Sequence, residues 1–171
     1  MQDSAPKVLR LFLLRHARSG WALPGQRDFD RALDETGYVE AETLAQMAAD
    51  HGIRPERILC STAVRCRETA EPFFRTVSED LDIRYIDELY SGPTSVYFDL
   101  IDAHRHLSSL MLVGHNPMIE QLLYRLIGDD QAREAVPHGY PPACLAVVDL
   151  AAAAGTDGAD ATLVSLLLPN Q

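Results

Sequence analysis

Short apolar runs of strand length alternate along this chain with longer segments in which apolar residues recur at helical spacing. The first run, Val8–Leu14, carries large apolar residues on both faces, which is typical of a strand covered by helices on two sides. Thr36–His51 follows with apolar residues close to helical spacing, and Gly52 stands where a helix C-terminal cap is expected. The pattern predicts a strand, a polar loop and a crossover helix.

The same alternation continues through the middle of the chain. It predicts three further strands, each followed by a helix, in the order Arg57–Cys60, Ala63–Val77, Ile83–Ile86, Thr94–Leu107, Ser109–Val113 and Pro117–Ile127. Pro72 lies inside the first of these helices, where a proline removes a backbone hydrogen bond and is expected to interrupt or restart the helix.

The C-terminal part of the chain lacks this alternation of strands and helices. Gly128–Pro142 contains three prolines and two glycines, which predicts an irregular surface loop. Cys144–Leu150 and Thr162–Leu168 flank a stretch rich in alanine, glycine and aspartate, which predicts two strands joined as a hairpin. Together the elements predict an α/β fold, a three-layer α/β/α sandwich whose mostly parallel sheet has about six strands and an antiparallel element. We expect residues 1–171 to form a single domain.

The composition argues against some classes of binding partner and indicates a cellular compartment, but it does not identify the function. A formal net charge of −10 would repel phosphate backbones and acidic headgroups, so we expect no nucleic-acid partner and no membrane. Cys60, Cys66 and Cys144 are odd in number and lack paired spacing, which favours free thiols in a reducing compartment. The polar segment Met1–Lys7 lacks the apolar stretch of a signal peptide, and no apolar run could span a bilayer. A cytoplasmic location is therefore expected.

Polar side chains follow four of the predicted strands closely. Arg15 and His16 come after the first, Ser61–Arg65 after the second, Glu88 after the third and Gly114–Asn116 after the fourth. Because the carboxyl ends of parallel strands meet at one sheet edge, we expect these segments to converge. Arginine forks match phosphate oxygens and histidine can act as a nucleophile or a donor, so this composition suits a phosphoryl group. Each residue alone also fits a structural role, and only their convergence favours chemistry.

Three sequence segments resemble a known family. "LLRHARSGW" resembles the Arg-His-Gly signature of the histidine phosphatase superfamily, "ILCSTAVRCRETA" its second-arginine segment and "LMLVGHNPMIEQL" its second-histidine segment. The stretch "LLRHARSGW…DFDRALDETGYVEA" is similar to the small SixA-type phosphohistidine phosphatases. Ala17 replaces the usual glycine, a small-for-small change. The resemblance implies a phosphoglycerate mutase-like fold and a phosphatase activity that requires no metal and no cofactor.

The resemblance also implies roles for single residues. His16 would be the nucleophile that takes the phosphoryl group, while Arg15, Arg65 and His115 would hold its oxygens. This division suits phosphoryl transfer, because charge spreads over the equatorial oxygens and catalysis depends on positioning and cationic stabilisation.

Four further residues are candidates for the pocket. Ser19 and Thr62 would add hydroxyl donors at its wall. Arg31, in "FDRAL", matches an arginine of the SixA-like pattern and would either reach the site or anchor its own loop. Glu88 would be a proton donor for the leaving group, as a helper to the four principal residues.

Three hypotheses for the function follow. The first is a phosphatase that removes phosphate from phosphohistidine in a signalling or phosphotransfer protein and releases inorganic phosphate. It is favoured because a short chain has few residues to form a lid, and because a leaving imidazole can carry its own proton. The second is a general phosphomonoesterase or mutase-like enzyme on small phosphorylated metabolites. The third is a non-catalytic phosphate-binding module.

Overall fold

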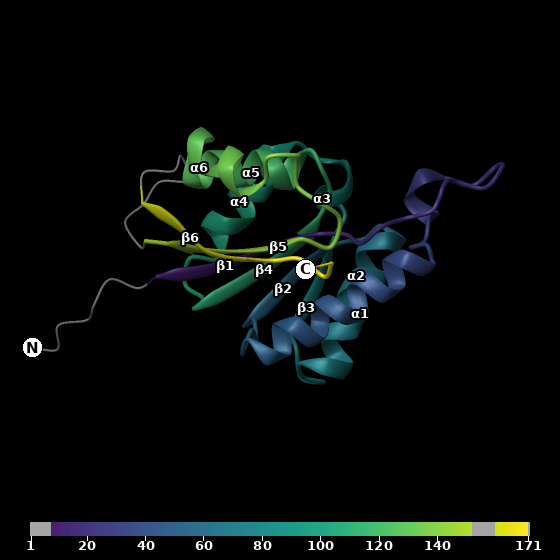
Figure 1. Ribbon diagram of the computed structural model, residues 1–171, viewed down its shortest axis with the longest axis horizontal. Helices are drawn as coiled ribbons and strands as arrows, with labels where there is room; N and C mark the ends of the chain where they lie inside the picture. The colour runs from purple at the N-terminus through teal and green to yellow at the C-terminus, as the bar shows by residue number, and fades with distance from the viewer. Residues whose placement is uncertain (1–7, 152–159, 171) are drawn as a thin grey trace, which may run out of the picture.

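The computed structural model describes residues 8–151 and 160–170. In these ranges six strands form one sheet in the order β3-β2-β4-β1-β5-β6 (Figure 1). Their bounds are Leu9–Arg15 (β1), Arg57–Ser61 (β2), Ile83–Ile86 (β3), Ser109–Gly114 (β4), Leu145–Leu150 (β5) and Ala161–Leu167 (β6). The strands from β3 to β1 are parallel, whereas β5 pairs antiparallel with β1 and β6 antiparallel with β5. The predicted α/β class, with a mostly parallel sheet and an antiparallel element, is confirmed.

Helices cover both faces of the sheet (Figure 1). On one face lie α1 (Glu35–Asp50) and α2 (Val64–Thr76). On the other lie α4 (Thr94–Ala103), α5 (Met118–Ile127) and α6 (Asp129–Ala135). Two short elements, the 3-10 helix η1 (Asp28–Asp30) and α3 (Glu88–Ser91), stand near the end of the sheet at which β1 finishes.

The apolar pattern of β1 explains this layering. Leu11 and Leu13 belong to the core under α4 and α5, while Phe12 and Leu14 belong to the core under α1 and α2. All four side chains are buried, because successive residues of a strand point to opposite faces and both faces are covered. Because both faces of β1 are packed, its last residue, Arg15, is held in a defined position between the two helix layers.

Three details differ from the sequence predictions. Gly128–Pro142 is not an irregular loop throughout, because α6 forms inside it with Asp129 and Asp130 in its first turn and Ala132 buried against the core. Pro72 does not interrupt α2, which runs unbroken around it. α4 ends at Ala103 rather than at residue 107. The connection between β5 and β6 lies outside the described residues.

No helix in the described ranges combines the length and the apolarity that crossing a membrane requires.

Candidate active site

Three strand ends place the polar side chains at one edge of the sheet. Arg15 ends β1 and His16 follows it, Arg65 lies in the first turn of α2 after β2, and His115 follows β4. Because β2, β4 and β1 are parallel neighbours, these positions converge on a cavity of about 620 Å³. Within the part of the chain that the structure describes, the residues that line this cavity are Arg15, His16, Ser19, Asp28, Arg31, Arg65, Tyr90, Ser91, His115, Asn116 and Met118. An acidic chain therefore contains a pocket with three arginines.

His16 lies at the bottom of this cavity with 8% of its surface exposed. Its Nδ1 atom is 2.7 Å from the carbonyl oxygen of Ala17. A carbonyl only accepts, so Nδ1 carries the ring proton and Nε2 keeps a free lone pair. Burial, together with the charges of Arg65 and Arg15, lowers the pKa of His16 to about 3. The ring is therefore neutral at physiological pH, which is the state that a nucleophile requires.

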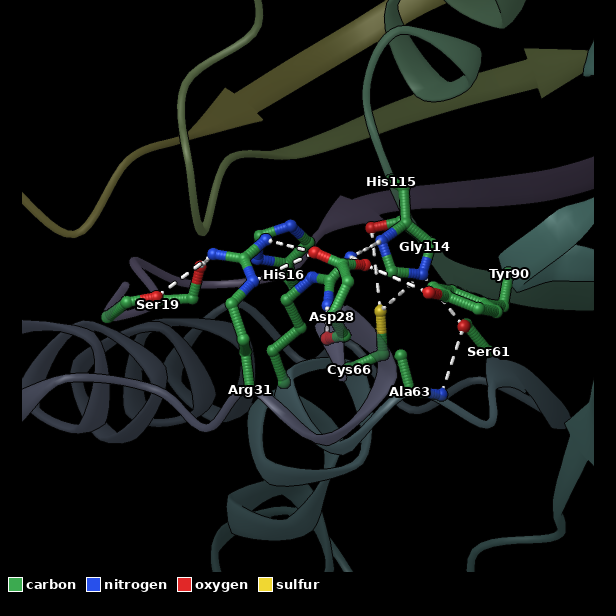
Figure 2. Close-up of polar contacts among 12 residues, drawn as sticks. His16, Ser19, Asp28, Arg31, Ser61, Ala63, Cys66, Tyr90, Gly114 and His115 are labelled. Carbon is green, nitrogen blue, oxygen red and sulfur yellow. Dashed lines mark hydrogen bonds and ion pairs between the residues drawn. The ribbon is translucent and has the colours of Figure 1, made fainter. Parts of the chain in front are cut away.

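His115 faces His16, with 5.3 Å between the ring centroids (Figure 2). Its Nδ1 accepts from Nη2 of Arg65 at 3.3 Å, because a guanidinium only donates. In the neutral ring the proton is then on Nε2, which lies 2.8 Å from Oγ of Ser61 and 3.4 Å from Sγ of Cys66. Burial, followed by the charge of Arg65, lowers the pKa of His115 to about 4. This second ring is held in place from below by Ser61 and Cys66.

Arg15 is half-buried and Arg65 is buried, and both side chains line the cavity. Nη1 of Arg15 donates to the carbonyl of Tyr140 at 2.7 Å, which ties this side chain to the loop before β5. Among the described residues, the Nε atoms of Arg15 and Arg65 are buried and have no hydrogen-bond partner. Buried polar groups are rarely left without a partner, and arginine donors match phosphate oxygens. Three arginines in the lining therefore give the cavity a chemistry that suits an anion.

Asp28, in η1, joins the rim of the cavity to its floor (Figure 2). Its Oδ2 accepts from Arg65 at 3.1 Å and from the Tyr90 hydroxyl at 2.9 Å, while its Oδ1 accepts from Nε of Arg31 at 2.8 Å. Partial burial alone would raise the pKa of this carboxyl, but Tyr90 and the two arginines outweigh it and lower the pKa to about 2. Asp28 is thus an ionised carboxylate between two arginines.

The comparisons with known proteins agree with this geometry. A model of the histidine phosphatase superfamily (branch 1) matches residues 11–90. The crystal structure of a candidate phosphohistidine phosphatase, SixA from Agrobacterium tumefaciens, has a TM-score of 0.84 and 45% sequence identity to this chain. That match covers 94% of this chain and 98% of the other. The chain belongs to the histidine phosphatase superfamily.

This histidine phosphatase is also similar to a second SixA structure and to a plant protein. A candidate phosphohistidine phosphatase SixA from Nakamurella multipartitia is 28% identical with a TM-score of 0.75, over 98% of this chain and all of the other. An uncharacterized chloroplastic protein of Arabidopsis thaliana is 34% identical over 129 residues, which are 70% of this chain and 59% of that protein's length. The fold is the phosphoglycerate mutase-like fold of SixA, and the chain is a phosphatase.

The structure of this histidine phosphatase brings most of the predicted pocket residues together. Besides the four principal side chains, Ser19 and Arg31 line the cavity. Arg31 lies in the lining and donates to Asp28, to the carbonyl of Gly20 at 2.9 Å and to Oγ of Ser19 at 3.2 Å, so it contacts both the cavity and its own loop.

Two predicted pocket residues lie elsewhere. Glu88 is exposed at the start of α3 and is absent from the described lining, whereas Tyr90 belongs to it. Residues two apart on a helix point about 200° away from each other, so α3 can turn only one of these two side chains to the cavity. Oγ1 of Thr62 is buried without a described partner and also lies outside the lining.

Four further side chains contribute to the site in roles that the sequence did not predict. Asp28 and Tyr90 line the cavity, and Ser61 and Cys66 support His115 from behind. The spacing of Asp28 and Arg31, three residues apart in a polar loop, is the signal that could have indicated an ion pair there.

Among the described residues, no group of three or more His, Cys, Asp or Glu side chains is arranged to hold a metal ion.

Proposed function

We propose that this phosphatase removes phosphate from phosphohistidine in a signalling or phosphotransfer protein, through a covalent phosphohistidine on His16. The observation that carries the proposal is the state of His16: its Nδ1 proton is bound to the Ala17 carbonyl and its ring is neutral. Its Nε2 is therefore available to attack a phosphorus atom whose oxygens would be held by Arg15 and Arg65. His115 would join them once its Nδ1, which accepts from Arg65 here, carries a proton of its own.

The proposed reaction has two balanced steps. In the first, the Nε2 lone pair of His16 forms a bond to phosphorus while the bond from phosphorus to the leaving nitrogen breaks, and its electron pair stays on the leaving ring. In the second, a water oxygen forms a bond to phosphorus, and the electron pair of the broken bond returns to His16 as the water proton is lost to solvent. The products are histidine and inorganic phosphate, and the two arginines stabilise the charge on the phosphoryl oxygens in both steps.

The proton requirements of the leaving group support phosphohistidine over phosphate esters. An alkoxide leaving group needs a proton from the enzyme. Asp28, the carboxyl group in the described lining, is ionised and cannot supply that proton, and Glu88 lies outside the lining. An imidazole can leave with a proton already on its other nitrogen. The Agrobacterium relative, at 45% identity, is itself a candidate phosphohistidine phosphatase, which further supports this substrate class.

The three cysteines support a location for this activity. Cys60, Cys66 and Cys144 are all free and buried. Unpaired thiols are typical of proteins from reducing compartments. We therefore propose that the substrate is a cytoplasmic phosphoprotein.

The test is to trap the covalent intermediate. The protein is mixed with a panel of phosphohistidine proteins and small phosphoesters carrying labelled phosphate, and the reaction is quenched in base, in which phosphohistidine survives. We expect acid-labile label on the wild type, none on His16→Ala, and normal labelling of His51→Ala, whose exposed ring lies at the far end of α1.

The outcomes separate the three hypotheses. Label that survives His16→Ala would exclude the mechanism. Turnover of small metabolites alone would indicate the general phosphomonoesterase. Phosphate affinity without any covalent label would indicate a binding module.

A further inference from the structure

We propose that Asp28 makes this enzyme selective for a protonated imidazole leaving group, and so for phosphohistidine over phosphate esters. The inference rests on the proposed function and adds to it the residue that would recognise the departing ring.

Asp28 lies on the side of the cavity from which the leaving group departs. His16, Arg65 and His115 form the buried floor, with 8%, 6% and 5% of their surfaces exposed. The Asp28 side chain is 53% exposed, at the rim. In an in-line displacement the leaving group lies opposite the nucleophile, here towards solvent. Figure 2 shows the Asp28 carboxylate between Arg31 and Tyr90, with which it shares hydrogen bonds, and all three residues line the same cavity as His16.

The carboxylate is held firmly in this position. Arg31 and the Tyr90 hydroxyl each donate to it, and the Asp28 carbonyl accepts from Nη1 of Arg65 at 2.9 Å. Tyr90 adds an aromatic wall, with its ring centroid 5.6 Å from that of His115 and 5.1 Å from that of Phe29. A flat ring with an N–H group fits such a rim, because the aromatic side chains can contact the ring and the carboxylate can accept a hydrogen bond from its N–H group.

Binding of the phosphoryl group would free the carboxylate for this task. Without substrate, Arg65 divides its donors between Asp28 and His115. Phosphoryl oxygens compete for the same guanidinium group, and each N–H that turns to phosphate releases a lone pair of Asp28. The released oxygen can then accept from the second nitrogen of the substrate imidazole.

The proton balance explains why this contact selects the substrate. In phosphohistidine one ring nitrogen bears phosphorus, and the other must be protonated for the ring to leave as neutral imidazole. A carboxylate beside that N–H favours the protonated ring and therefore the breaking of the phosphorus–nitrogen bond. A phosphate ester has no such N–H, and Asp28 carries no proton to give it. The same negative charge therefore favours one substrate class and gives the other no help.

The test compares two probes, phosphoimidazole and para-nitrophenyl phosphate, on the full-length protein. The second probe leaves as a stable phenolate and needs no proton. In Asp28→Asn, the ratio of kcat/KM for phosphoimidazole to that for para-nitrophenyl phosphate should fall about 10-fold, the effect expected of one charge-assisted hydrogen bond. Asp28→Glu keeps the charge and should recover part of the ratio.

Asp30 provides a matched control. It belongs to the same 3-10 helix and pairs with Arg27 at 2.9 Å, but it is absent from the described cavity lining. Asp30→Asn makes the same charge change in the same loop and should leave the ratio unchanged.

A pH profile separates recognition of the leaving group from simple positioning of Arg65. The alkaline limb of kcat for phosphoimidazole reports the imidazole proton in the bound complex, and it should move about one unit to lower pH in Asp28→Asn. An equal fall for both probes with an unmoved limb would overturn the role of Asp28 and leave the proposed function intact. A wild type that turns over para-nitrophenyl phosphate but not phosphoimidazole would overturn both.

Discussion

Lowering the pH from 7 to 5 should destabilise this protein through two histidines that folding keeps neutral. The pKa is about 3 for His16 and about 4 for His115, against 6.5 for an exposed histidine. Because folding lowers both pKa values, the unfolded chain binds more protons than the native state once the pH approaches 6.5 from above. The free energy of unfolding therefore decreases as the pH is lowered. Integrated from pH 7 to pH 5, each histidine costs about 2 kcal/mol and the pair about 4 kcal/mol.

The assay is urea unfolding at both pH values for the wild type, the two single glutamine variants and the double variant His16→Gln/His115→Gln. Groups elsewhere titrate equally in all four proteins and cancel in the comparison. Asp28 does not contribute in this window, because its pKa falls from 3.8 to about 2 and its effect belongs to lower pH. The wild type should lose about 4 kcal/mol more than the double variant, with each single variant midway. An identical loss in wild type and double variant would refute the claim that burial keeps these rings neutral.

Two further predictions concern the support of the site. Ser61→Ala removes the hydroxyl that lies 2.8 Å from Nε2 of His115, and it should lower kcat for para-nitrophenyl phosphate about 10-fold with little change in KM. An unchanged kcat would show that this contact does not orient the ring. Gly114→Ala would push a methyl group into the buried Tyr97 side chain and should lower stability in urea by about 1–3 kcal/mol. Gly20→Ala, where the nearest heavy atom to the new methyl lies at 4.0 Å, is its control and should stay within about 0.5 kcal/mol of wild type.

Much of the fold can be predicted from the local spacing of apolar residues in the sequence. The central strand β1 alternates its apolar residues between two covered faces, and each predicted strand is confirmed to within a residue or two. These features depend on side-chain periodicity, which is a property of neighbouring residues. The helix α6 was not readable, because its seven residues lie between Gly128 and Pro137 and its stability comes from packing of Ala132 on the core.

By itself, the sequence determined that an arginine and a histidine end a buried parallel strand, and that two similar segments follow neighbouring strands. It could not determine which further side chains meet them. Asp28 contacts Arg65 across 37 positions of chain and Tyr90 across 62, and the helical phase of α3 turns Tyr90 rather than Glu88 to the cavity. Such contacts depend on where a loop returns and how a helix is rotated, and both are decided by the packing of the whole molecule rather than by the residues next to them in the chain.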